Sequence, residues 1–169
     1  MVPGNYTVEL TVDGQTYKQP LTVKLDPRVD TSADDLEAQV TLARRIATGM
    51  NVSFDEYQKL DALMKAFDGH SKEEKAQAAD LEKQIKAVAE GKTASPGLGP
   101  VNRDLGRLLF GIESADERPS APQAQAVEEE CSALTTTLAL WKALNDGLAS
   151  QNPLHLPVDA EVSATGCAR

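Results

Sequence analysis

The sequence predicts a mainly α-helical protein, an antiparallel bundle of long, coiled-coil-like helices preceded by an N-terminal β-hairpin. Apolar and polar residues alternate on both sides of an Asp-Gly pair near the N-terminus, and apolar residues then recur at spacings of three and four. Aromatic residues make up only 4% of the 169 residues, which suits closely packed helices better than a β-sandwich. We expect a β-hairpin over 1–29, a helical bundle over 30–150 and a flexible tail over 151–169.

The hairpin is predicted from residue alternation and from its turn. Asp13-Gly14 follows an alternating run and is the strongest short signal for a two-residue type I′ turn. Pairing outward from this turn gathers the apolar side chains on one face. Pro20 cannot donate to a ladder, so the second strand is predicted to be an edge strand or bulged. The predicted partners are Thr11 with Thr16, Leu10 with Tyr17, Glu9 with Lys18 and Tyr6 with Leu21.

A long first helix is predicted from about Ala33 to Phe67. Thr31, Ser32 and the acids after them form a favourable helix N-terminus. Gly49 and the capping-box pattern Ser53–Glu56 could instead divide this segment into two helices. The apolar seam keeps its phase across that point, so we expect one continuous helix. The predicted inward seam is Leu36, Val40, Ala43, Ala47, Met50, Phe54 and Tyr57.

Three further helices are predicted. A capping box at Ser71 opens a helix that ends at Gly91, with Ala78, Leu81, Ile85 and Val88 facing inward. Residues 93–100 are predicted to form a loop. A short helix follows, with Val101, Leu105, Leu108 and Ile112 inward. The last helix starts at Ser120, stops at Asn152-Pro153, and has Val127, Cys131, Leu134, Leu138, Trp141 and Leu148 as its seam.

Composition narrows the possible functions. A net charge of −9 argues against nucleic acid, because phosphate binding needs a surplus of basic residues on one face. No apolar run approaches the ~20 residues that cross a membrane. The first residues lack the basic start and apolar core of a signal peptide, so a secreted parent protein would carry its signal upstream.

The sequence offers no catalytic, cofactor-binding or metal-binding residues. Cys131 lies on a predicted helix core face, where we expect a small buried thiol, and Cys167 lies in the tail. A disulfide between them is possible, but no CxxC pair or nearby histidine suggests a metal site. The histidines, His70 and His155, have no partner at ligand spacing and are expected to be surface or loop residues.

The remaining candidates also have simpler interpretations. Asp30, Asp34 and Asp35 do not match an EF-hand loop, and the helix dipole explains acids at a helix start. The run 128–130 of glutamates is expected to be a solvated helix face. No GxSxG, P-loop or dinucleotide motif occurs. Met50, Met64 and Trp141 are predicted to be core residues.

One part of the chain resembles a known family. The segments PGNYTVELTVDGQTYKQPLTVKLDPRV (3–29) and TSADDLEAQVTLARRI (31–46) resemble the C-terminal end of large bacterial secreted proteins with sortilin-like, BNR/Asp-box β-propellers, which are labelled glycosyl hydrolases. The resemblance implies that the hairpin is the last pair of strands of an immunoglobulin-like domain and that a helical segment follows. It also implies a secreted or periplasmic location. Asp-box motifs are absent, so no propeller is expected here and no catalytic residue is carried over.

We therefore expect a non-catalytic C-terminal structural or interaction module of a larger secreted propeller protein. Its expected partners are the rest of the parent protein or a second copy of the chain, either one binding through the hairpin. One alternative is that the chain belongs to a glycoside hydrolase whose catalytic residues lie upstream. Another is a free-standing helical adaptor whose groove binds a partner helix.

Overall fold

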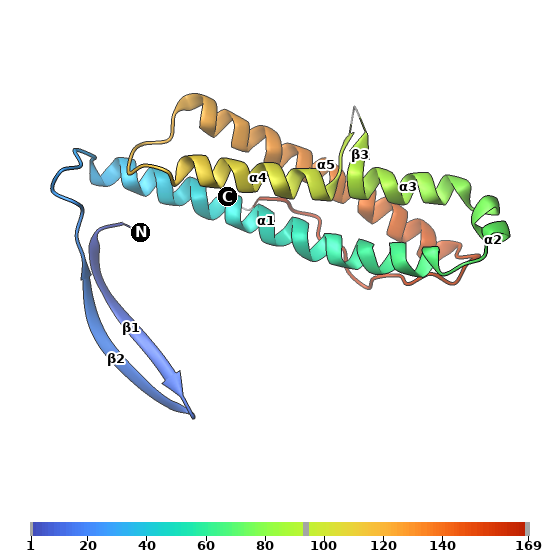
Figure 1. The fold of residues 1–169 in the computed structure, drawn as a ribbon, viewed down its shortest axis with the longest axis horizontal. Coiled ribbons are helices and arrows are strands. Elements are labelled where there is room, and N and C mark those ends of the chain that lie inside the picture. Colours follow the sequence, from blue (N-terminus) through green and yellow to red (C-terminus); the bar gives the residue numbers. More distant parts are fainter. Residues whose placement is uncertain (1, 93–94, 168–169) are drawn as a thin grey trace.

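The computed structural model describes residues 2–92 and 95–167, and the fold is mainly helical with an antiparallel β-hairpin at its N-terminus (Figure 1). Residues 93–94 of the predicted loop and 168–169 of the predicted tail lie outside the described residues. The helices α1–α5 of the described part are here called the helical body: α4 and α3 lie end to end along α1, α5 runs alongside them, and α2 lies at the far end. The hairpin projects from the end where α1 begins. The helices are α1 (Ala33–Asp68), α2 (Lys72–Gln77), α3 (Ala79–Glu90), α4 (Leu98–Ile112) and α5 (Ala121–Ser150).

The hairpin consists of β1 (Gly4–Val12) and β2 (Gln15–Val23), and its predicted register is confirmed at every pair. Asp13 and Gly14 have φ angles of 49° and 77°, the positive values that a type I′ turn requires. On the polar face the Lys18 Nζ lies 3.0 Å from a Glu9 carboxylate oxygen. Among the described residues this sheet has two strands, so Pro20 lies on an edge strand, as predicted.

The first helix is continuous across Gly49, as predicted, and Ser32 caps its start by accepting a hydrogen bond from the Asp35 amide. The predicted inward face of this helix is wrong. Its most buried residues are Leu36, Gln39, Ile46, Gly49, Ser53, Glu56, Leu60, Leu63 and Phe67. Apart from Leu36, the true face lies about one position N-terminal to the predicted seam, and Phe54 is exposed. Polar residues and a glycine occupy core positions here, so apolar periodicity indicates a neighbouring face.

The second predicted helix is divided at Ala78, whose φ and ψ of −109° and 25° are not helical. The capping box at Ser71 is confirmed, but α2 has no buried residue, so no packing holds it in line with α3. The chain then forms the short strands β3 (Gly91–Lys92) and β4 (Ser95–Pro96).

The predicted loop over 93–100 extends too far, because α4 already begins at Leu98, which is fully buried. Pro100 fits this first helical turn because its missing amide proton has no intrahelical acceptor there.

The core lies where α4 packs along α1 and against α5. The predicted seam of α5 is confirmed along its whole length, and Leu134, Leu138 and Trp141 have no exposed surface. The predicted inward face of α4 is confirmed at Val101, Leu105 and Ile112.

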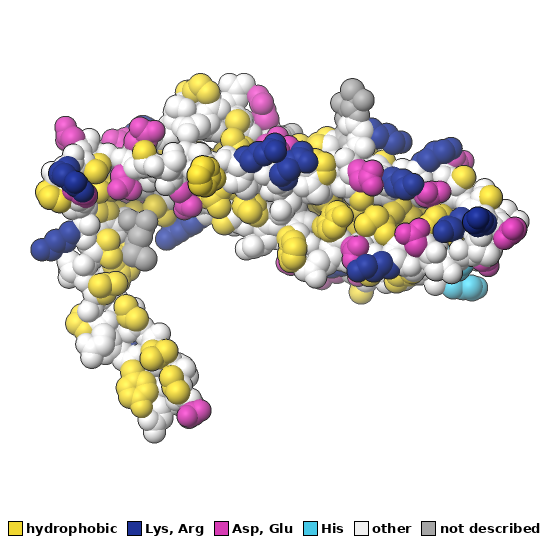
Figure 2. Space-filling view, viewed as in Figure 1, with side chains coloured by type: hydrophobic (Ala, Val, Ile, Leu, Met, Phe, Trp, Pro, Cys, Tyr) yellow, Lys and Arg dark blue, Asp and Glu magenta, His cyan; other side chains and the backbone are white. Residues whose placement is uncertain are grey.

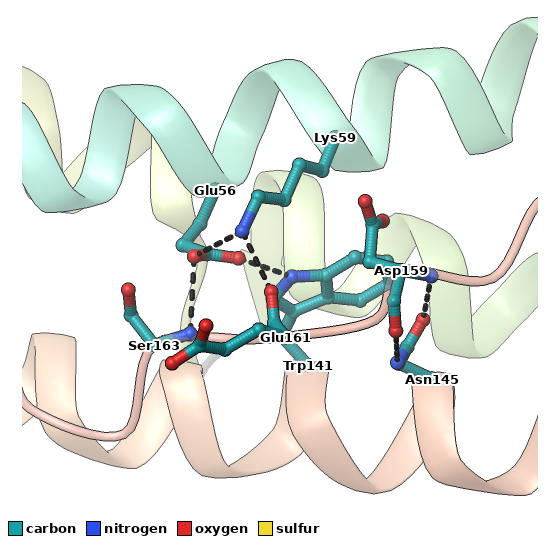
Figure 3. Close-up of polar contacts among 7 residues, drawn as sticks. All are labelled: Glu56, Lys59, Trp141, Asn145, Asp159, Glu161 and Ser163. Atoms are coloured by element: carbon teal, nitrogen blue, oxygen red, sulfur yellow. Dashed lines mark hydrogen bonds and ion pairs between the residues drawn. The ribbon is translucent and has the colours of Figure 1, made fainter.

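The C-terminal segment over 151–167, here called the strap, is predicted from its sequence to be a flexible tail, and in the structure it packs on the helical body. It folds back and runs between α1 and α5 (Figures 1 and 3). Leu156 is buried, and side chains of both helices form hydrogen bonds with the strap backbone. These contacts have no sequence period, which explains why hydrophobic patterning could not reveal them.

Candidate functional site

The most buried ionisable group of the helical body is the Glu56 carboxylate on α1, which is 1% exposed. The Trp141 indole Nε1 of α5 donates a hydrogen bond to Glu56 Oε2 at 2.8 Å. The Ser163 amide of the strap donates to Glu56 Oε1 at 3.0 Å, and the Lys59 Nζ lies 2.8 Å from the same oxygen (Figure 3). Glu56 therefore joins two helices and the strap through one carboxylate.

The surroundings of Glu56 favour its charged form. Burial alone would raise the pKa of this carboxyl group, because a charge is poorly solvated inside a protein. Hydrogen bonds from Lys59, the Ser163 amide and the Trp141 indole act in the opposite direction and outweigh burial, so the pKa of Glu56 is lowered. A carboxylate held in this way is a poor proton donor. Its hydrogen bonds come from Lys59, Trp141 and Ser163 of the protein.

Lys59 extends this network to the strap backbone. Its Nζ donates to the Glu161 carbonyl oxygen at 2.8 Å as well as pairing with Glu56. One helical turn beyond Trp141, the Asn145 side chain donates to the Asp159 carbonyl oxygen and accepts from the Asp159 amide, each at 2.9 Å (Figure 3). The helical body thus holds a segment without regular secondary structure by its main chain.

The strap begins and ends at fixed points. At its start the Asn152 side chain accepts from the Leu156 amide at 2.8 Å and donates to the Leu156 carbonyl oxygen at 2.7 Å. At its end a disulfide joins Cys131 of α5 to Cys167, so the expectation of a buried thiol at Cys131 is wrong and the disulfide that the sequence left possible is formed. The bond closes a loop with a sequence separation of 36 residues.

Neither histidine of the chain takes part in this site. His70 is partly buried in the turn after α1, where its Nδ1 lies 3.5 Å from a Glu74 carboxylate oxygen. His155 is exposed in the turn that opens the strap, with a φ of 51°.

Among the acids at the start of α1, Asp35 is held by contacts within the protein. Asp35 hydrogen-bonds to Ser32 and pairs with Arg118 at 3.0 Å. These contacts lower the pKa of Asp35, and the hydrogen bond with Ser32 has the larger effect. In the described ranges 2–92 and 95–167 no group of three potential ligand side chains could hold a metal ion. Across the same ranges no helix is long and apolar enough to cross a membrane.

The glutamate run on α5 is largely solvated, as expected. Glu128 and Glu129 are exposed, and Glu128 forms an ion pair with Arg45 of α1. Glu130 is partly buried; this burial, with the neighbouring Asp104 and Glu129 carboxylates, raises its pKa.

Sequence reasoning missed Glu56, Lys59 and Asn145. The Ser53–Glu56 spacing resembles a capping box, yet both residues are buried inside a continuous helix and serve tertiary contacts. The Asn102 side chain of α4 donates to Ser53 Oγ at 2.8 Å. One signal in the sequence could have indicated the burial of Glu56. It lies three residues after Ser53 and four before Leu60, so the three side chains share one face of the helix.

Two open grooves lie elsewhere on the helical body. The groove between α2–α3 and the end of α5 has a volume of about 440 Å³ and an apolar wall that includes Leu81, Leu144 and Leu148. The groove beside the start of α1 has a volume of about 630 Å³ and is lined by both acids and arginines, among them Glu37, Arg45 and Arg118.

A comparison of the chain with protein-family models, curated proteins and solved structures finds no match.

Proposed function

We propose that this chain is a non-catalytic structural and interaction module at the C-terminal end of a larger secreted propeller protein. The observation that carries the proposal is the exposed apolar face of the hairpin. Val8, Leu10 and Tyr17 are 50%, 58% and 56% exposed, and Figure 2 shows apolar side chains gathered on the projecting hairpin. A patch of this kind on an ordered element usually marks an interaction site.

The chemistry of the two hairpin faces indicates what kind of surface covers it. Tyr6, Leu10, Tyr17 and Leu21 lie on one face, while the opposite face carries the Glu9–Lys18 ion pair and the Thr11–Thr16 contact. This division is typical of a sheet that packs one face on a second sheet. The resemblance to immunoglobulin-like C-terminal strands agrees with it, so we assign the partner sheet to the parent protein.

In this proposal the helical body is an antiparallel bundle with coiled-coil-like crossing that gives the end of the parent protein a rigid closing element. The long continuous α1 and its packing on α4 and α5 support this description. The Cys131–Cys167 disulfide supports a secreted protein, because such bonds persist mainly in oxidising compartments.

The proposal that this module is non-catalytic is supported by the surroundings of Glu56, its most buried acidic residue. Glycoside hydrolysis needs two carboxyl groups roughly 5–10 Å apart on either side of a cleft. Glu56 instead has its oxygens occupied by Trp141, Ser163 and Lys59. Any glycan chemistry of the parent protein is therefore assigned to residues upstream.

A second candidate is a helical adaptor. The groove of about 440 Å³ between α2–α3 and α5 favours it, since its apolar wall suits the apolar face of a partner helix.

The genomic reading frame upstream of Met1 distinguishes the two candidates. Sequences that encode propeller repeats and an immunoglobulin-like domain are expected there. An in-frame stop codon directly upstream would contradict the leading proposal and favour the adaptor.

A further inference from the structure

Side chains of α1 and α5 hold the strap through hydrogen bonds to its backbone. Asn145 forms a reciprocal pair with the Asp159 amide and carbonyl, Lys59 donates to the Glu161 carbonyl, and Glu56 accepts from the Ser163 amide (Figure 3). These contacts are made with main-chain groups of the strap and with none of its side chains. The surface between α1 and α5 formed by Glu56, Lys59, Trp141 and Asn145 is here called the strap groove.

Two apolar side chains of the strap also pack on the helical body, one before these polar contacts and one among them. Leu156 is 4% exposed and belongs to the core cluster, and Val162 packs against the same cluster. The strap groove therefore combines apolar contacts with polar groups that bind the strap backbone. In peptide recognition, main-chain hydrogen bonds give affinity and side-chain contacts give specificity.

The charges of the groove also suit occupants of varied sequence. Glu56 and Lys59 lie 2.8 Å apart and neutralise one another, so neither depends on a charged side chain of the strap. The acidic strap residue Glu161 contacts Lys59 through its carbonyl oxygen.

We propose that the strap groove is a binding site for a non-helical peptide segment, which it recognises through the backbone, and that the strap is its resident occupant. The Cys131–Cys167 disulfide keeps the strap in place, so an external peptide gains access once that bond is reduced. In this step a dithiol reductant supplies two electrons and two protons. The S–S bond breaks, both cysteines become thiols, and the reductant becomes a disulfide. This activity lies beyond the proposed structural role and does not depend on the hairpin.

The test uses the full chain and a labelled synthetic peptide with the sequence of 153–166 as the probe. The variant Cys131→Ser/Cys167→Ser/Asp159→Pro/Ser163→Pro lacks the bond and the two strap amides, while its groove residues are unchanged. Fluorescence polarisation should show saturable binding to this variant. Binding to the oxidised wild type should be at least about tenfold weaker, because the tethered strap competes at high effective concentration.

Matched controls distinguish recognition of the backbone from nonspecific hydrophobic binding. A probe with Asp159→Pro and Ser163→Pro should not bind, whereas a probe with Glu161→Ala should bind unchanged. Adding Asn145→Asp to the four-residue variant should weaken binding, and Asn51→Asp, at an exposed position of α1, should not. Equal binding of all probes, or no binding to a variant that retains its helical circular dichroism, would overturn the proposal.

Amide exchange in the wild type gives an independent result if the variant does not fold. Reduction of the disulfide should speed exchange of the Asp159 and Ser163 amides while the amides of the α5 core stay protected. When unlabelled probe peptide is added in excess to the reduced protein, the amides of the bound probe should become protected. Unchanged exchange of both strap amides after reduction would show that the disulfide does not retain the strap and would overturn the proposal.

Discussion

The Cys167 sulfur lies where a side chain on Gly49 would begin. A Cβ atom built on Gly49 would come within 2.6 Å of Cys167 Sγ and within 3.1 Å of Leu105 Cδ1. The glycine in the middle of α1 is therefore neither a helix end nor a flexible point. It is the position where the disulfide-bonded end of the strap approaches the helix backbone.

Gly49→Ala should destabilise the oxidised protein by about 1–3 kcal/mol, as overpacking of a close contact does. The matched control is Gly147→Ala in α5, where the added Cβ would meet nothing within 4 Å apart from its chain neighbours and the nearby backbone of its own helix. That change should stabilise by about 0.5–1 kcal/mol, since alanine favours a helix over glycine. Urea unfolding measures both, and the Gly49→Ala loss should shrink in a Cys167→Ser background. A stabilising Gly49→Ala would show that the strap does not occupy this position.

Removing the charge of Glu56 should weaken attachment of the strap. Glu56→Gln loses charge-assisted hydrogen bonds from Lys59, Trp141 and the Ser163 amide, and we expect a loss of about 1.5–3 kcal/mol in the free energy of unfolding. Glu129→Gln, an exposed change on α5, should stay within about 0.5 kcal/mol. Equal losses would mean that Glu56 is as solvated as Glu129.

The contribution of Glu56 should also depend on pH. Its pKa is lower in the folded chain than in the unfolded chain, so the charged form stabilises the fold above the ordinary glutamate pKa of about 4.3. This stabilisation is lost as the pH falls through the lowered folded-state pKa. The difference between wild type and Glu56→Gln should therefore shrink in acid, and taking that difference removes the opposite contribution of Glu130, whose pKa is raised. A difference that grows in acid would contradict the assignment.

The α5 core face can be tested with two leucines on the same helix. Leu138 has no exposed surface, and Leu138→Ala should cost about 2–5 kcal/mol. Leu140 is 41% exposed, and Leu140→Ala should cost within roughly 0.5 kcal/mol. Thermal unfolding of the two variants gives the comparison. Similar shifts in Tm would show that α5 presents a different face to the core.

The disulfide should contribute measurably to stability. Closing a loop with this sequence separation of 36 residues is worth about 4 kcal/mol in the chain-entropy description, within a usual range of roughly 2–5. The Cys131→Ser/Cys167→Ser variant should therefore unfold at lower urea concentration than the oxidised wild type. Thiol titration of the native protein should find no free cysteine, and two reactive thiols would contradict the bond.

Much of the fold followed from local patterns, and the errors have physical causes. Asp13-Gly14 set the hairpin register, and α5 was predicted well because apolar residues occupy most of its core positions. On α1 the core positions include Gln39, Ser53 and Glu56, which are satisfied by hydrogen bonds. A pattern of apolar residues cannot identify such a face.

The strap was missed for a related reason. Its binding depends on backbone groups at 159–163 and on a disulfide between residues far apart in the sequence. Neither feature produces a sequence period, and two cysteines alone left the pairing open. The hydrogen-bond network around Glu56 involves α1, α5 and the strap, so it could be identified only from the three-dimensional arrangement of these segments.

The central proposal is that the hairpin packs on a β-sheet of a larger parent protein, and amide hydrogen exchange over 4–23 tests it most directly. The measurement compares this chain alone with the same chain extended by the upstream part of its reading frame, with light scattering to establish the monomer. A lone two-stranded hairpin is marginally stable in water. The hairpin amides should therefore exchange rapidly in the isolated monomer and become protected in the extended chain. Hairpin amides as protected as the α5 core in a strict monomer of the isolated chain would contradict the proposal.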